Sequence, residues 1–203
     1  MRLPLCKVGA RRALDTVMPL PLAHTLVGYA TAAGTGVRFR RDTWTALIFS
    51  VVVANLPDVD FLPGALRNDP VLYHRTVAHT LVAAMLCGLI IAAILTRFRG
   101  RFWEIALLGA LVYSSHLFAD MIDFGGGNIG VPILWPLSNA SFSIKTPLSR
   151  MSSTPLVFHR GEGTGGFFAS FTGFGFIRAL VLQALLFSPL LLPAWWIRSR
   201  RAP

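Results

Sequence analysis

Hydrophobic residues in this chain gather into long runs instead of alternating with polar residues. The runs cover residues 22–37, 43–56, 77–95, 102–122 and 174–197. Runs of this kind predict membrane helices, which need about 20 apolar residues to cross a bilayer. Residues 43–56 are too few for a crossing and reach far enough only if 57–63 are added. The pattern therefore predicts an all-α, polytopic membrane protein with about five membrane helices.

The segments outside the runs define the domain limits. Residues 1–17 carry four basic residues and no apolar pattern. We expect them to be a disordered or non-native extension, with Met18 as the natural start. Residues 18–203 then form a single membrane-embedded domain, because the chain is too short for two domains of this kind.

A long polar stretch, residues 123–173, separates the last two runs and is rich in Gly, Pro and Ser. It is too polar to span a membrane and too long for a simple connection. We expect an irregular extracytoplasmic loop with short strands, an interfacial turn or a partly ordered lid. The Gly125–Gly127 run is not a phosphate-binding loop, because no Lys-Ser/Thr pair follows it and no strand precedes it.

Composition agrees with a membrane protein, since hydrophobic residues make up 54% of the chain and charged residues only 14%. The formal net charge is +10. Nucleic-acid binding would require a basic patch on a water-facing domain, whereas here the basic residues form short clusters between apolar runs. We therefore expect no nucleic-acid partner.

The basic clusters also predict an orientation. Positively charged residues favour the cytoplasmic side. Three runs are each followed by a basic cluster, and this rule places all three clusters in the cytoplasm. The clusters are Arg38/Arg40/Arg41, Arg97/Arg99/Arg101 and Arg198/Arg200/Arg201. Trp44, Trp103, Trp195 and Trp196 then lie at the cytoplasmic interface, as in an aromatic belt. The chain is expected in the inner (plasma) membrane.

Seven ionisable residues lie at the opposite, outer ends of the runs. None of them belongs to the basic clusters that predict the orientation. They are His24, Asp58, Asp60, His74, His79, His116 and Asp120. Such groups are costly beside hydrocarbon unless they are paired. Their convergence on one face of the membrane suggests that a cation lies between them.

The residue types and spacings point to a divalent metal. His116 and Asp120 are four apart and share one helix face, although a buried His–Asp hydrogen bond would give the same pattern. Asp58 and Asp60 should be presented at the tip of a helix that Pro57 ends or kinks, although Pro-Asp is also a common capping pair. Imidazoles and carboxylates together match zinc ligation with room for a second ion. We predict zinc, with manganese as the alternative.

Several polar side chains have more than one interpretation. Arg75 suits an anionic substrate, or else contacts a lipid headgroup or forms a salt bridge to Asp58 or Asp60. His74 and His79 are too far apart for one helical face, but both can turn toward one point if His74 precedes the helix and His79 lies in its first turn. His159 is most simply a solvated loop residue, and Glu104 should pair with a nearby arginine.

The combined pattern resembles the membrane-bound, metal-dependent hydrolase family, also called the LexA-binding, inner-membrane-associated hydrolases. The residues that carry it are His24, Pro57-Asp58-Val59-Asp60, His74-Arg75, His79-Thr80, His116, Asp120 and Trp135-Pro136. The resemblance covers about residues 18–136. The family usually has Gly or Ser after His-Arg and Thr before the second His, where this chain has Thr76 and Ala78.

This family is thought to be distantly related to zinc-dependent phospholipase C and the zinc-dependent single-strand nucleases. The resemblance therefore implies hydrolysis of a phosphoester, with the seven His and Asp residues as the metal shell. Asp58 or Asp60 would orient or deprotonate a metal-bound water, and Arg75 would hold the anionic oxygens. The expected partners are membrane lipid and an anionic, lipid-linked substrate; the oligomeric state is left open.

Two alternatives are not enzymes. A protein that binds or transports a divalent metal would use the same ligands but need a polar route across the membrane, and residues 81–95 contain no charged side chain. A structural membrane protein with a metal-free polar cluster would tolerate Asp58→Ala.

Overall fold

The computed structural model of the protein describes residues 20–35, 43–67, 72–96, 101–123, 130–145 and 174–200. Most of these residues are helical. The longer helices are α1 (Pro21–Thr35), α2 (Thr43–Asn55), α4 (Leu81–Thr96), α5 (Phe102–Met121), α7 (Phe174–Phe187) and α8 (Leu191–Arg200). The expectations for residues 1–17, for Gly125–Gly127 and for His159 lie outside the described residues.

The predicted interruption after α2 is confirmed. Proline lacks an amide hydrogen and cannot continue a regular helix, and α2 ends at Asn55, two residues before Pro57. The chain continues as the 3-10 helix η1 (Pro57–Asp60) and the short helix α3 (Phe61–Ala65). Together with α2 they form the 22-residue apolar segment Trp44–Ala65, which is long enough to cross a membrane.

Three segments, not five, are long and apolar enough to be candidate spans among the described residues: Trp44–Ala65, Phe102–Met121 and Leu180–Ile197. The prediction of a span at 77–95 is wrong at its start. Residues Val77–His79 form the 3-10 helix η2, and only Leu81–Thr96, a shorter apolar helix of 16 residues, is α-helical. Thr80 ends η2 because its Oγ1 accepts a hydrogen bond from Ala83 N (3.1 Å) and so caps α4.

The last apolar run is also interrupted. The break expected at Pro189 is confirmed by the 3-10 helix η4 (Ser188–Leu190) between α7 and α8. No break occurs at Pro193, which lies in the first turn of α8. Proline is tolerated there because first-turn amides have no intrahelical acceptor.

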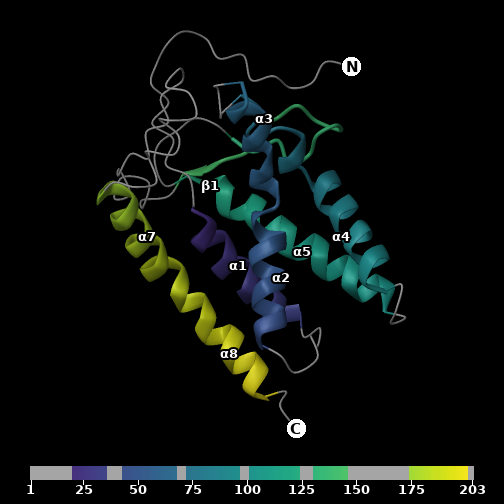
Figure 1. Cartoon of the computed structure of the whole chain (residues 1–203), viewed down its shortest axis with the longest axis vertical. Helices are drawn as coiled ribbons and strands as arrows, with labels where there is room; N and C mark the ends of the chain where they lie inside the picture. The colour runs from purple at the N-terminus through teal and green to yellow at the C-terminus, as the bar shows by residue number, and fades with distance from the viewer. Residues whose placement is uncertain are drawn as a thin grey trace.

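Helix α5 lies between α4 and α1–α2, and its side chains fill the core (Figure 1). The tightest crossing is between α4 and α5 at Gly88 and Gly109. A Cβ added at Gly88 would lie 2.3 Å from the Ala106 carbonyl oxygen and 2.8 Å from the Ala110 nitrogen. Small residues at such crossings let membrane helices pack backbone against backbone.

The helices define two ends of the molecule. The start of α2, the end of α4 and the start of α5 share one end with the last turn of α8. The start of α1, α3 and β1 lie towards the other end (Figure 1). Trp44 and Trp103, the second residues of α2 and α5, are largely exposed. Glu104 pairs with Arg101, as predicted.

The described part of the polar stretch lies at the end of the molecule where α1 starts (Figure 1). Strand β1 (Ile122–Asp123) pairs in parallel with β2 (Ile144–Lys145), and Val131 forms an antiparallel bridge with Phe142. The Ile133 carbonyl accepts a hydrogen bond from the Leu81 amide (3.0 Å), which attaches this segment to the start of α4. Short strands were expected here and are confirmed for residues 130–145.

A buried glutamine joins the C-terminal helices to α1. The Oε1 atom of Gln183 on α7 accepts a hydrogen bond from the Leu20 amide (2.6 Å), and the Leu20 carbonyl accepts bonds from Ala23 N and His24 N. We expect Gln183→Leu to lower the free energy of unfolding by about 1 to 3 kcal/mol, because it leaves the Leu20 amide unpaired. Denaturant titration in mixed micelles would measure this, with Gln183→Glu retaining the acceptor. Equal stability of Gln183→Leu and the natural chain would contradict it.

Candidate metal centre

All seven predicted His and Asp side chains converge at one end of the helices. Helix α1 supplies His24, η1 supplies Asp58 and Asp60, the segment ending in η2 supplies His74 and His79, and α5 supplies His116 and Asp120. Five of the seven residues are buried, and Asp58 has the most exposed side chain of the seven (21%). The two aspartates were expected to stand exposed at a helix tip; instead η1 directs them into the cluster.

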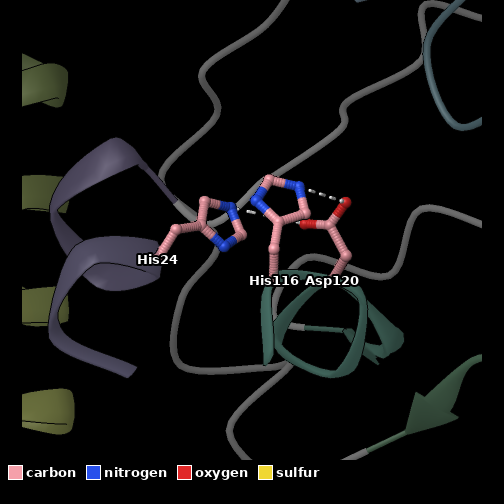
Figure 2. Close-up of side chains that lie close together, drawn as sticks. All are labelled: His24, His116 and Asp120. Atoms are coloured by element: carbon pink, nitrogen blue, oxygen red, sulfur yellow. Dashed lines mark ion pairs between the residues drawn. The ribbon is translucent and has the colours of Figure 1, made fainter. Parts of the chain in front are cut away.

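The first candidate group is built on α5. His116 and Asp120 are one turn apart, with Nε2 and Oδ2 separated by 3.6 Å. His24 reaches the same Asp120 through Nε2 and Oδ1 (3.6 Å) and stacks on the His116 ring at 3.7 Å (Figure 2). The Nδ1 atom of His116 lies 2.7 Å from the Ala54 carbonyl, which can only accept. His116 therefore carries its proton on Nδ1 and presents the Nε2 lone pair to the site.

The second and third groups share His79. Its Nε2 lies 3.3 Å from His116 Nε2 and 3.8 Å from Asp58 Oδ1. Its Nδ1 lies 3.0 Å from Asp60 Oδ2, and the other oxygen of Asp60 is 3.1 Å from His74 Nδ1. The ring centroids of His74 and His79 are 4.8 Å apart, so the two residues meet as expected. The expectation that His79 lies in the first turn of the helix is wrong, because His79 belongs to η2 and α4 begins at Leu81.

Three overlapping sets of donor atoms are each close enough to hold a metal ion. They are His24/His116/Asp120, Asp58/His79/His116 and Asp60/His74/His79. The polar atoms of the third set are poorly satisfied by the protein alone. Asp60 Oδ2, His79 Nδ1 and His74 Nε2 are buried and make no hydrogen bond of acceptable geometry. Unsatisfied buried donors and acceptors are rare and costly, so the cluster fits a bound cation.

The carboxylates of the cluster favour positive charge beside them. Burial opposes protonation of His79, but its contacts with Asp120 and Asp60 outweigh that effect and raise the pKa of His79 to about 9. A metal ion bound through His79 would have to displace this proton. Burial lowers the pKa of His74, against the opposing pull of Asp60. Nitrogen and oxygen donors of this kind suit zinc or manganese.

Arg75 pairs with Asp120 (Nε to Oδ2, 3.3 Å) and not with Asp58 or Asp60, so that alternative is wrong. Its side chain is only 9% exposed, which also excludes a position turned towards lipid headgroups. The backbone at Arg75 has a φ of 55°, an uncommon left-handed conformation for a residue other than glycine. At this bend the successive side chains of His74 and Arg75 both enter the cluster.

No role was predicted for Tyr113, which contacts the segment that carries His79. The Tyr113 hydroxyl on α5 donates a hydrogen bond to the Ala78 carbonyl (2.7 Å), next to His79. The only signal in the sequence is its position three residues before His116, on the same helix face.

These features define an integral membrane protein with a buried His/Asp cluster that fits metal ions. The sequence profile of the family described as YdjM inner membrane protein matches residues 18–198, which is most of the chain. The chain therefore belongs to this family of LexA-binding, inner-membrane-associated proteins, as the resemblance predicted. It is an inner-membrane protein with three candidate membrane-crossing helices. No curated protein and no solved structure matches the chain.

Proposed function

We propose that this protein is a membrane-bound, metal-dependent hydrolase that cleaves a phosphoester of a lipid or lipid-linked substrate. The observation that carries the proposal is the convergence of three overlapping His/Asp donor sets in one buried cluster. A divalent ion held there would activate water and stabilise the negative charge that develops during hydrolysis.

The two aspartates of η1 have different surroundings. Both oxygens of Asp60 face imidazoles, at 3.1 Å from His74 and 3.0 Å from His79, so Asp60 is suited to hold these rings. Asp58 has the more exposed side chain, and its Oδ1 lies 3.4 Å from His116 Nε2. We therefore assign to Asp58 the orientation of the attacking water and the acceptance of its proton.

Arg75 supplies the positive charge for an anionic substrate. Its guanidinium lies within the cluster beside Asp120. A guanidinium is always charged and presents several donors to phosphate oxygens. Together with the metal-ligand set, this favours a phosphoester over a neutral ester.

Apolar side chains around Asp58 support a lipid substrate. Leu56, Val59 and Leu62 precede and follow it in the same segment and are all exposed, Leu62 by 60%. They belong to the candidate span Trp44–Ala65, so they face lipid and not water. A substrate that reaches Asp58 from this side needs an apolar part. The positive-inside rule places this end of the protein outside the cytoplasm.

Transport of the metal has no observation in its favour. In the described helices α1, α2 and α4, no charged side chain lies between the cluster and the opposite end of the helix. A transport route through these helices would need such side chains.

Asp58→Asn is the variant that tests the activity. We expect it to lower turnover of a fluorescent phosphatidate and of bis-p-nitrophenyl phosphate by about 100-fold or more, because the water loses its proton acceptor. Metal removal with a chelator should abolish turnover by the natural chain, and added zinc or manganese should restore it. Glu104→Gln is the matched control, since Glu104 is an exposed carboxylate on α5 that pairs with Arg101. Full turnover by Asp58→Asn, or by the metal-free protein, would refute the proposal.

A further inference from the structure

Tyr113 lies outside the seven-residue cluster but contacts the backbone that carries one of its members. The side chain is 4% exposed and projects from the middle of α5. Its hydroxyl donates to the Ala78 carbonyl at 2.7 Å, across 35 residues of sequence. Ala78 directly precedes His79, which belongs to two of the three donor sets.

The segment that carries His79 has little regular structure of its own. It is a three-residue 3-10 helix, in which His79 N donates a hydrogen bond to Thr76 O (3.1 Å). Thr80 Oγ1 donates to Val77 O within the same turn. A single 3-10 turn has weak hydrogen-bond geometry, so its orientation depends on contacts with neighbouring elements.

Helix α5 provides this contact on the same face that carries His116. Tyr113 and His116 are three residues apart and therefore lie on one side of the helix. Tyr113 fixes the Ala78 carbonyl beside His79, and His116 Nδ1 bonds the Ala54 carbonyl at the end of α2. The 3.3 Å separation of the His79 and His116 Nε2 atoms is thus set from one rigid element.

We propose that Tyr113 is a positioning residue, whose hydroxyl holds His79 at the distance from His116 that a shared metal ion requires. This inference rests on the proposed metal-binding role of the cluster. The competing explanation is that Tyr113 only fills the core, where its ring packs with other buried side chains of α4 and α5. The two explanations differ in what the hydroxyl alone contributes.

Tyr113→Phe removes the hydroxyl and keeps the ring. Ser115→Ala is the matched control, because Ser115 is a buried residue of the same helix whose hydroxyl donates to Val112 O within α5 (2.7 Å). The full-length protein in nanodiscs would be titrated with cobalt(II), whose visible absorption reports ligand geometry. We expect Tyr113→Phe to bind cobalt about 10- to 100-fold more weakly, in the range found when groups that orient metal ligands are removed, and to change its absorption spectrum. Ser115→Ala should do neither.

A second measurement does not depend on metal. In metal-free protein labelled with 15N-histidine, the ring nitrogens of His79 should shift in Tyr113→Phe and stay in place in Ser115→Ala, with His79→Gln used for assignment. Unchanged His79 resonances together with an unchanged cobalt spectrum would overturn the positioning role. If the natural chain binds no cobalt but the His79 resonances shift, the positioning of His79 stands and the metal-dependent function fails.

Discussion

Replacing His116 by alanine is expected to remove bound metal from the protein. His116 belongs to two of the three donor sets, and its Nε2 lies within 3.6 Å of His79, Asp58 and Asp120. Its loss leaves two of the sets one donor short. Elemental mass spectrometry of the detergent-purified protein should show at least a tenfold lower metal content than in the natural chain, since each of the two sets keeps only two protein donors, fewer than the three that hold a catalytic zinc ion.

Cys87→Ala serves as the control for this variant. Cys87 is a buried potential ligand on α4 that lies outside all three donor sets. It should retain the full metal content. Equal metal in His116→Ala and in the natural chain would show that the cluster is a polar network held together without metal. In that case the variant should lose the hydrogen bond to the Ala54 carbonyl and the contacts of the ring with His79, Asp58 and Asp120, but no metal.

Gly88→Ala is expected to prevent α4 and α5 from packing. The added Cβ would lie 2.3 Å from the Ala106 carbonyl oxygen and 2.8 Å from the Ala110 nitrogen. Both are backbone atoms of α5, which no side-chain rotation can move. The helices would have to separate, and we expect the free energy of unfolding to fall by about 3 kcal/mol or more.

Gly34→Ala provides a matched comparison, because a Cβ added at Gly34 meets no atom within 4 Å. The same substitution there should be neutral or slightly stabilising. Denaturant titration in mixed micelles of both variants measures the difference. Equal midpoints would mean that α4 and α5 do not cross at Gly88 as described. Because α5 carries His116 and Asp120, Gly88→Ala should also weaken metal binding.

Much of this architecture follows from local features of the sequence. Long apolar runs predicted the positions of α2, α5 and the C-terminal helices, and Pro57 and Pro189 marked interruptions because proline lacks an amide hydrogen. The seven residues of the cluster drew attention in the sequence because ionisable groups are rare at the ends of such runs. The basic clusters predicted the orientation of the runs, and this orientation put all seven residues at the opposite end.

Features that depend on tertiary contacts were not predictable in the same way. Hydropathy cannot separate η2 from α4, because Val77 and Ala78 are apolar although they lie in a 3-10 turn. Arg75 could reach several carboxylates, and neither its contact with Asp120 nor its left-handed backbone can be read from residue types. Tyr113 bonds a backbone carbonyl, and a carbonyl is present at every residue, so no pattern of residue types reveals the pair.

The face of α5 that carries Tyr113, His116 and Asp120 has a consequence for how homologous chains can vary in length. Each residue inserted into an α-helix rotates everything beyond it by about 100°. After an insertion between Tyr113 and Asp120, these side chains could no longer all face η2, α1 and the end of α2. Loops joining these elements can gain or lose residues at little energetic cost. The eight-residue interval from 113 to 120 should therefore have the same length in every homologue that keeps the cluster.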